Sequence, residues 1–307
     1  MTQSRKYPAG KQLLILLGIY LLTFVMEGVY YTLIPRWMFG LSYSEFLKAD
    51  FSIPAYRNCM KLLILLDCLI MYLMPAVLSI ALTRQKLTDW LQRATAIRPV
   101  LLIVLLTGII LPPVDDYLHG FSTSLMSPEQ LNILQLNFDV QKDILHNDSA
   151  MDFILSLIVF VVAPAICKIF FFIGVLQPVL IKLMPKLPWV GIFIASIIFA
   201  GSYFQLYALF ATFVFSYIIG SIYYMTRNIW LPVAVGGVSF SIWLVYYCLY
   251  DKGVINSNPF VPMTSSPIPA IIALAAIIAL LWFIRKRSPK PEVVDELSEE
   301  VGSIGVK

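Results

Sequence analysis

The chain has 307 residues, of which 59% are hydrophobic and 13% are charged, whereas soluble globular domains average about 45–50% apolar and about 25% charged residues. This composition excludes a soluble domain, and a scattered formal net charge of +4 argues against a nucleic-acid-binding protein. The four cysteines form no Cys-x-x-Cys pair, which argues against a zinc knuckle or a disulfide framework. The sequence therefore predicts a polytopic membrane protein.

Eight apolar segments approach the length that a spanning helix needs, roughly 20 residues. They are residues 13–34, 62–82, 99–114, 152–182, 189–204, 207–225, 229–250 and 268–284. The first follows basic residues, as in a signal peptide, but it is too long and no small-residue cleavage site follows it, so we interpret it as a retained helix. The expected fold is an all-α bundle of about eight transmembrane helices.

Lysine and arginine are distributed unevenly between the two sides that eight spans would create. With the N-terminus inside, fifteen of the 22 basic residues lie in inner segments and six in outer segments, while Lys168 lies within a span. The positive-inside rule therefore predicts that both termini are cytoplasmic. The first outer loop fits poorly, because it holds four of the six outer basic residues.

The outer loop 115–151 is acidic, with six aspartates and glutamates against one lysine. Its stretch SPEQ at 127–130 resembles a helix start, with a serine cap, a proline and a capping-box glutamine. Apolar residues then recur at helical spacing at Leu131, Leu134, Phe138 and Leu145. We expect an amphipathic helix on the outer membrane surface or across the end of the bundle. The alternative is a mobile surface loop whose charged side chains are solvated.

The chain is expected to form one transmembrane domain over residues 1–290. Its core is expected at 151–253, preceded by the amphipathic outer loop. The remaining residues, 291–307, are polar and acidic, and we expect them to be a disordered cytoplasmic tail.

Five pieces of the second half of the chain occur in an order that resembles one family. Between Ala163 and Gly253 they read APAIC, GVLQPVLIKLMPKLPWV, IIFAGSYFQLYALF, GSIYYMTRNIWLPVAV and YYCLYDKG. These pieces are similar to the CPBP family of intramembrane metalloproteases, the CAAX prenyl endopeptidase and bacteriocin-immunity type. The resemblance implies a CAAX-protease-like bundle and reaches the first three helices only as a hydropathy pattern.

The resemblance implies peptide hydrolysis inside the membrane. In the bacterial members that the chain resembles, a glutamate of a Glu-Glu-x-x-x-Arg motif acts with histidines of Phe-x-x-x-His and His-x-x-x-Asn motifs to activate a water. A histidine and the asparagine stabilise the developing oxyanion, and zinc or another divalent metal is implied. This chemistry needs a base and a polarising group around a buried water.

In this chain other residues occupy the positions that match those motifs. They are Lys168 and Ile169 for the glutamate pair, Ile173 for the arginine, Tyr203 for the first histidine, and Gly236 and Phe240 for the His-x-x-x-Asn motif. No glutamate occurs between Glu129 and Glu292, and the only histidines are His119 and His146. No shift of the alignment can supply the catalytic set, so we expect no functional catalytic residue, no metal and no other cofactor.

Lys168 lies near the middle of an apolar run, where a charge costs about 2.5–3.5 kcal/mol. Intramembrane charges usually face the interior and pair, and Asp67 and Glu27 are the only acidic residues deep in an apolar run. We expect a buried ion pair of Lys168 with Asp67, or with Glu27 as the alternative. The other interpretation is that the lysine only points into the former catalytic space.

The sequence favours a pseudoprotease of the bacterial inner membrane, which contacts lipid and binds a membrane peptide, a lipidated protein or a partner subunit, but no nucleic acid. Two alternatives stay open. One is an active intramembrane metalloendopeptidase with an atypical site, and the other is a carrier of lipid or a small molecule in the vacated space. A polar, water-filled space around Lys168 would favour ligand binding, and apolar filling would favour a scaffold.

A cysteine placed at Asp139 tests the predicted topology. A membrane-impermeant thiol reagent should label it in intact cells, because the acidic loop is expected outside. A cysteine at Lys290 should be labelled only after permeabilisation. Labelling of position 139 only after permeabilisation would contradict the model of both termini inside.

Overall fold

The computed structural model describes residues 7–83, 97–256, 258 and 266–287, and within these ranges every regular element is a helix. In chain order the elements are α1 (Ala9–Phe39), α2 (Tyr43–Phe46), α3 (Pro54–Asp67), η1 (Cys68–Leu73), α4 (Met74–Leu82), α6 (Ile97–Ile110), α7 (Pro112–Ser124), α8 (Pro128–Leu145), α9 (Ala150–Leu157), η2 (Ile158–Val162), α10 (Ala163–Ile169), η3 (Phe170–Leu176), α11 (Gln177–Leu183), α12 (Pro188–Gly201), η4 (Leu206–Ala208), α13 (Leu209–Thr226), α14 (Trp230–Asp251) and α15 (Ile268–Arg287). The turns η1, η2 and η3 are π-helical and lie inside longer helices, and η4 is a 3₁₀ turn. The all-α prediction is confirmed.

Six helices in the described ranges are long and apolar enough to cross a membrane. They are Ala9–Phe39, Pro54–Leu82, Ala150–Leu183, Leu206–Thr226, Trp230–Asp251 and Ile268–Lys286. The other two expected spans are shorter, because α12 has 14 residues and α6 ends at Ile110, before two prolines begin α7. A proline starts a helix more readily than it continues one, since it lacks the N–H and clashes with the preceding turn.

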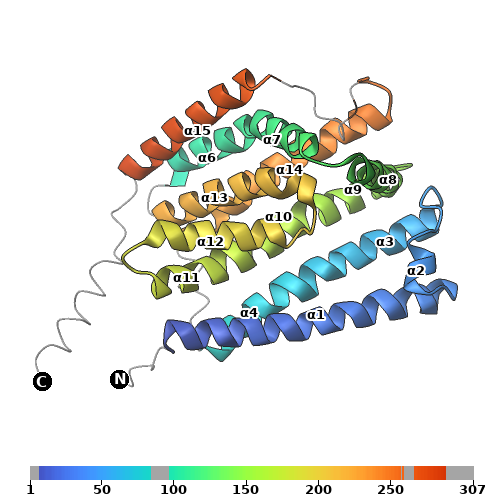
Figure 1. Ribbon diagram of the computed structural model, residues 1–307, viewed down its shortest axis with the longest axis horizontal. Helices are drawn as coiled ribbons and strands as arrows, with labels where there is room; N and C mark the ends of the chain where they lie inside the picture. The colour runs from blue at the N-terminus through green and yellow to red at the C-terminus, as the bar shows by residue number, and fades with distance from the viewer. Residues whose placement is uncertain (1–6, 84–96, 257, 259–265, 288–307) are drawn as a thin grey trace, which may run out of the picture.

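The helices form a bundle in which most axes run in similar directions (Figure 1). Helices α1, α3 and α4 lie along one side, α6, α7 and α15 along the other, and α10 to α14 lie between them (Figure 1). The start of α1 and the end of α15 lie at one end of the bundle, and α8 lies across the opposite end, here called the loop end. The acidic loop thus lies at the opposite end of the bundle from the start of α1 and the end of α15, and the side of the membrane on which each end lies stays a prediction.

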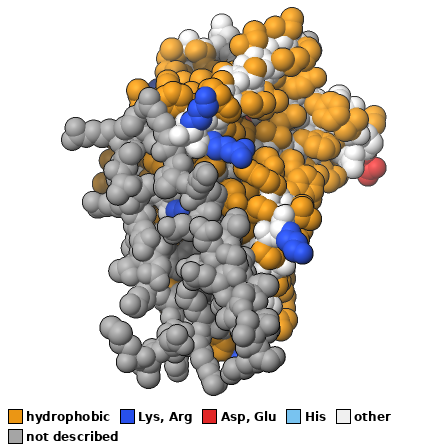
Figure 2. Space-filling view, turned by 90° about the vertical axis from the view of Figure 1, so that its left-hand side faces the viewer, with side chains coloured by type: hydrophobic (Ala, Val, Ile, Leu, Met, Phe, Trp, Pro, Cys, Tyr) orange, Lys and Arg blue, Asp and Glu red, His pale blue; other side chains and the backbone are white. Residues whose placement is uncertain are grey.

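The surface of the bundle is apolar along much of its described part. On α1, Leu14, Leu21 and Val25 are each more than half exposed. Figure 2 views the end of the bundle opposite the loop end, where apolar side chains dominate the described surface, with scattered lysine and arginine and very little acidic charge. Apolar side chains on the outside of a helix bundle fit a hydrocarbon environment, so the chain is a membrane protein with several spanning helices.

The acidic loop is largely helical, as the capping signal predicts. Ser127 accepts a hydrogen bond from the backbone N–H of Gln130, and the Gln130 side chain accepts one from the Ser127 N–H, which completes the capping box at the start of α8. On α8, Leu134, Phe138 and Leu145 are buried and pack with Leu244 and Tyr247 of α14. The loop therefore caps the bundle, and the alternative of a mobile surface loop is wrong.

The second span begins earlier than expected. The predicted span was 62–82, but α3 starts at Pro54 and continues through η1 into α4. Arg57 and Lys61 are consequently fully buried within a helix rather than exposed in a loop. This placement explains why the first outer loop fitted the positive-inside rule poorly. Within the domain expected over 1–290, residues 1–6, 84–96, 257, 259–265 and 288–290 are outside the described residues, as is the expected tail 291–307.

Replacing Gly191 with alanine tests the close contact between α11 and α12. A Cβ atom at this position would lie 3.0 Å from the backbone nitrogen of Ile181 and 3.1 Å from its Cα, atoms that cannot move aside alone. Overpacking of this kind costs about 1–3 kcal/mol, so thermal unfolding of the detergent-solubilised protein should occur at lower temperature. Gly18→Ala is the matched control, because a Cβ there meets nothing within 4 Å. Equal unfolding temperatures for the two variants would refute the contact.

Candidate functional site

The element that carries Lys168 is a long helix with two widened turns. From Ala150 to Leu183 the chain is continuously helical, but η2 and η3 are π-helical, and each comes directly before a short segment whose second residue is a proline, Pro164 in α10 and Pro178 in α11. The same order occurs at η1 and Pro75. A proline removes one N–H and crowds the preceding carbonyl, and a π-helical turn accommodates this and is frequent at functional sites.

The Lys168 ammonium lies between two tyrosine rings. Its Nζ is 3.9 Å from the ring centroid of Tyr203, which follows α12, and 5.0 Å from the ring centroid of Tyr72 in η1. Contacts between a cation and an aromatic face contribute about 0.5–2 kcal/mol each. Two of them offset much of the cost of about 2.5–3.5 kcal/mol for a central lysine. The aromatic rings therefore explain how the bundle tolerates this charge.

The expected direct ion pair of Lys168 is not formed. Among the described residues the ion pairs involve Arg57 and the two histidines, and none joins Lys168 to Asp67 or Glu27 within 4.0 Å. Asp67 is near enough to interact electrostatically with Lys168, and Glu27 interacts with Asp67. The tyrosine rings take the place of a contacting carboxylate, and a longer-range coupling to Asp67 stays a prediction.

The other positions that match the family motifs are closely packed. Ile169 and Ile173 are fully buried, and Gly236 of α14 is so near α10 that a Cβ atom on it would lie 2.5 Å from Ile169 Cδ1 and 3.7 Å from the Phe240 ring. Positions that are distant in sequence thus converge on one place, as the resemblance implies. The residues at this place are two isoleucines, Ile169 and Ile173, together with Gly236 and the ring of Phe240.

A chain of aromatic rings links these positions to Tyr203. Phe199 of α12 lies 4.9 Å from Phe172, 5.7 Å from Tyr203 and 6.3 Å from Phe215, and Phe215 lies 5.6 Å from Phe240, measured between ring centroids. These rings belong to the main buried cluster or pack directly against it. The place where the motif positions converge is therefore filled by apolar side chains, which is the outcome expected of a scaffold.

The side chains at these positions do not fit a zinc ion. Zinc is held by cysteine, histidine, aspartate or glutamate, usually four ligands in a tetrahedron. The converging residues offer one amine and one phenol, and the amine is engaged with two rings. Within the described ranges no group of three or more histidine, cysteine, aspartate or glutamate side chains is arranged to hold a metal. These positions therefore supply neither the ligands nor the base that metal-assisted hydrolysis requires.

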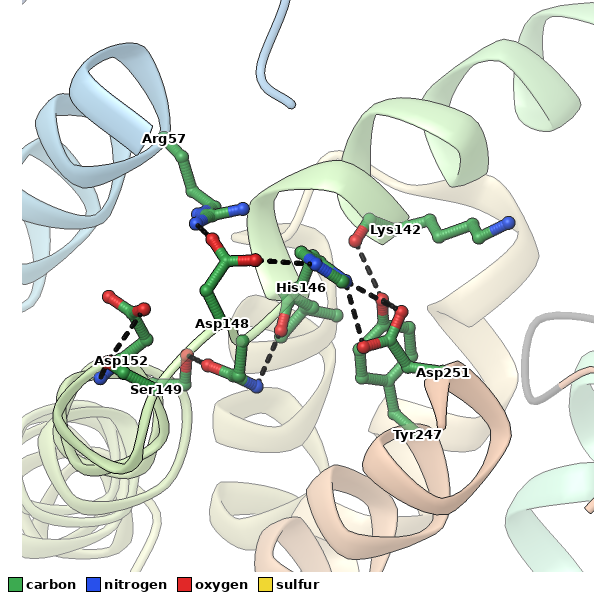
Figure 3. Close-up of polar contacts among 11 residues, drawn as sticks. Arg57, Lys142, His146, Asp148, Ser149, Asp152, Tyr247 and Asp251 are labelled. Atoms are coloured by element: carbon green, nitrogen blue, oxygen red, sulfur yellow. Dashed lines mark hydrogen bonds and ion pairs between the residues drawn. The ribbon is translucent and has the colours of Figure 1, made fainter. Parts of the chain in front are cut away.

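A second polar group lies at the loop end and joins three segments (Figure 3). Arg57 of α3 pairs with Asp148, His146 bonds to both Asp148 and Asp251 of α14, and Tyr247 donates a hydrogen bond to the Lys142 carbonyl, with an O–O distance of 2.7 Å. We call Arg57, His146, Asp148, Tyr247 and Asp251 the loop-end cluster. Sequence analysis missed it, because the residues are up to 194 positions apart. The excess of basic residues in the first outer loop was the one signal that pointed to it.

A comparison with known families agrees with the resemblance found in the sequence. A family described as "Type II CAAX prenyl endopeptidase Rce1-like" matches residues 150–239. The matched segment runs from the start of α9 into α14 and contains Lys168, Ile169, Ile173, Tyr203 and Gly236. No curated protein and no solved structure matches the chain. The family prediction is thus confirmed for this segment.

A double-mutant cycle tests the contact between Lys168 and Tyr203. Lys168→Met and Tyr203→Leu should each destabilise the solubilised protein, and their coupling should be about 0.5–2 kcal/mol, because each removes the same cation–ring contact. Tyr203→Phe is the matched control that keeps the ring and should keep the coupling. Additivity within about 0.5 kcal/mol would contradict the contact. The same cycle with Asp67→Asn measures the predicted longer-range coupling.

Proposed function

Starting from an Rce1-like domain over residues 150–239, we propose that this chain is a non-catalytic relative of the type II CAAX prenyl endopeptidases. It retains the helical framework of an intramembrane peptidase and uses it to bind a membrane peptide or a lipidated protein without cleaving it. We place it in a bacterial cytoplasmic membrane with both termini inside. The resemblance to bacterial family members and the distribution of basic residues support this location.

The single observation that carries the proposal is the contact between Ile169 and Gly236. The family places a catalytic glutamate and a histidine at these positions, and here an aliphatic side chain fills the space next to a bare backbone. A general base must reach a bound water at about 2.6–3.2 Å. Neither residue can accept or donate a proton, and their close packing supports the absence of a water site between them.

The amino-acid inventory supports the same conclusion independently of any contact. The chain contains two histidines, and neither is on α10, α12 or α14: His146 belongs to the loop-end cluster, and His119 lies in α7, 5.5 Å from the Tyr207 ring. No glutamate occurs between Glu129 and Glu292. An active peptidase would need a different base and a different polarising group, and Lys168 is held against Tyr72 and Tyr203.

Two features around Lys168 support the proposed binding role: the widened turns of its helix and the partial exposure of Lys168 and Tyr203. The widened turns η2 and η3 still flank Lys168, and the Lys168 side chain is partly rather than fully buried. Tyr203 is also partly exposed and lies in the short connection between α12 and η4. A carrier for lipid would need open space among these residues, and the packed rings favour a peptide-binding scaffold over that alternative.

The purified protein should bind a farnesylated peptide and leave it intact. Fluorescence anisotropy measures binding of the labelled peptide, mass spectrometry measures cleavage, and elemental analysis measures zinc. We expect saturable binding, no cleavage and no stoichiometric zinc, because the base and metal ligands are missing. The same peptide without its farnesyl group is the control and should bind more weakly.

The outcomes separate the possibilities. About one zinc per chain together with chelator-sensitive cleavage would overturn the pseudoprotease proposal in favour of an active enzyme with an atypical site. Saturable binding of a free lipid, with no preference for the lipidated peptide, would instead favour the lipid carrier. Absence of binding to either probe would contradict the proposed binding role.

A further inference from the structure

The His146 ring lies between two carboxylates that come from different parts of the chain. Its Nδ1 is 2.9 Å from Asp251 at the end of α14, and its Nε2 is 3.0 Å from Asp148 in the connection between α8 and α9 (Figure 3). Asp148 in turn pairs with Arg57 of α3. One imidazole thus stands in the middle of a path that joins α3 to α14 through the α8–α9 connection.

This geometry requires a protonated ring. A neutral imidazole has one N–H donor and one acceptor nitrogen, whereas an imidazolium has two donors. Both ring nitrogens of His146 face carboxylate oxygens. An ionised carboxylate can accept hydrogen bonds but cannot donate them. Arg57, by its hydrogen bond and its charge, lowers the pKa of Asp148, so this carboxyl stays ionised. The two carboxylates therefore each receive a hydrogen bond from His146 only when the ring is an imidazolium, which has an N–H on both nitrogens.

We propose that His146 is a proton-dependent clasp, which holds the loop end of the bundle together when the ring is charged and loosens it when the ring is neutral. The device is separate from the proposed binding function and does not depend on it. If the acidic loop faces the outside, as the distribution of basic residues predicts, the clasp responds to the external pH.

The charges that surround the ring support an imidazolium. The neighbouring basic side chains are Arg57 and Lys61, one helical turn apart on α3 and both fully buried. The acids are Asp148, Asp251 and Asp152, which interacts electrostatically with Lys61. Two cations thus face three carboxylates, and a charged His146 makes the numbers equal. The Lys61 ammonium, which contacts no hydrogen-bond partner in the described structure, lies in the field of Asp152 and Asp148.

Other charged groups nearby leave that balance unchanged. The Lys142 side chain points away from His146, and its backbone carbonyl accepts the Tyr247 hydroxyl (Figure 3). Asp143 acts on Tyr247 and Lys252 acts on Cys248, which adds one charge of each sign at the edge of the cluster. The ionic groups that act most strongly on His146 itself are Asp251 and Asp148.

Loss of the proton breaks one particular link. Asp148 keeps Arg57 as a partner, but Asp251 is left only with Tyr247, whose hydroxyl is 3.5 Å away and already donates to Lys142. The remaining N–H therefore stays on Nδ1 for Asp251, and Nε2 then turns a lone pair toward Asp148 at 3.0 Å. Two acceptors at this distance repel each other, so the α8–α9 connection must rearrange.

The neighbouring residue confines that rearrangement. Asn147 donates a hydrogen bond to the Leu145 carbonyl at 2.7 Å and accepts one from the buried Ser156 hydroxyl at 2.8 Å. These bonds carry no titratable charge and tie the connection to α9. The clasp should consequently loosen between His146 and Asp148, while Asp148 stays paired with Arg57 and α8 and α9 stay helical.

The sign of the pH dependence follows from the direction of the shift. The hydrogen bond to Asp251 raises the pKa of His146 above its usual value of 6.5 in the folded protein, against the effect of burial. A group with a raised folded pKa stabilises the fold fully below its unfolded pKa, and that stabilisation is lost as pH rises through the folded pKa. The loop end is therefore most stable at mildly acidic pH.

Because the chain has only two histidines, the contribution of each to the pH dependence of stability can be measured by replacing them one at a time. Thermal unfolding of the full-length solubilised protein, followed from about pH 5.5 to about pH 9, should show a midpoint that falls by about 2–4 °C with rising pH. Burial lowers the pKa of His119, but the neighbouring Asp115 raises it further, so His119 adds a pH dependence of its own. The His119→Gln protein is therefore the matched reference: it should keep a fall, and adding His146→Gln to it should abolish that fall.

A second measurement keeps the test valid if His146→Gln does not fold. In the His119→Gln protein labelled with ¹⁵N-histidine, His146 gives the only imidazole signals, and its titration reads the pKa directly. We expect both ring nitrogens to show the imidazolium signature at pH 6.5 and the midpoint to lie above that value. A His146 midpoint at or below 6.5, or an equal pH dependence with and without the His146 ring, would overturn the clasp.

Discussion

The interior of this bundle depends on the contact between α10 and α14, where Ile169 occupies the space that any side chain at position 236 would need. Glycine at 236 and isoleucine at 169 are therefore fitted to each other, and neither can be changed alone without a clash or a gap. Phe215 and Phe240 close the remaining space around them. A side chain introduced at position 236 alone would therefore meet a closely packed core.

The lysine at the preceding position shows how the bundle accommodates a buried charge. A charged side chain inside a membrane protein usually pairs with a side chain of opposite charge. Here the ammonium of Lys168 instead lies over the electron-rich ring faces of Tyr72 and Tyr203. Tyrosine rings are already suited to an apolar interior, so this solution adds no second ion that would need solvation. The nearest acid, Asp67, acts at longer range.

The sequence predicts the parts of the structure that are set locally. Apolar runs locate the spanning helices, and the stretch Ser127–Gln130 locates the start of α8, because a capping box is decided within four residues. The residue at which a spanning helix begins depends on contacts with residues that are distant in the sequence. The early start of α3 at Pro54 depends on burying Arg57 against Asp148, 91 residues away, and no local pattern reveals that pairing.

The candidate site was predictable in its positions but not in its contents. The structure places Lys168 against Tyr203 and Ile169 against Gly236. An ion pair was expected for Lys168 because acids are the usual partners of a buried charge, whereas aromatic rings serve the same need here. The contacts of His146 in the acidic loop could not be predicted, because the carboxylate of Asp251 reaches His146 only through the tertiary fold.

The proline-linked wide turns have a consequence for how this chain can be compared with others. Each residue of an ordinary α-helix turns the side-chain direction by about 100°, so a turn that takes in one extra residue offsets the inward face of everything after it. Between Ala150 and Leu183 this offset occurs at η2 and again at η3. A helical wheel drawn straight through the segment would mix lipid-facing and inward residues. Pro164 and Pro178 lie just after these turns, so they mark in the sequence where the inward face changes direction.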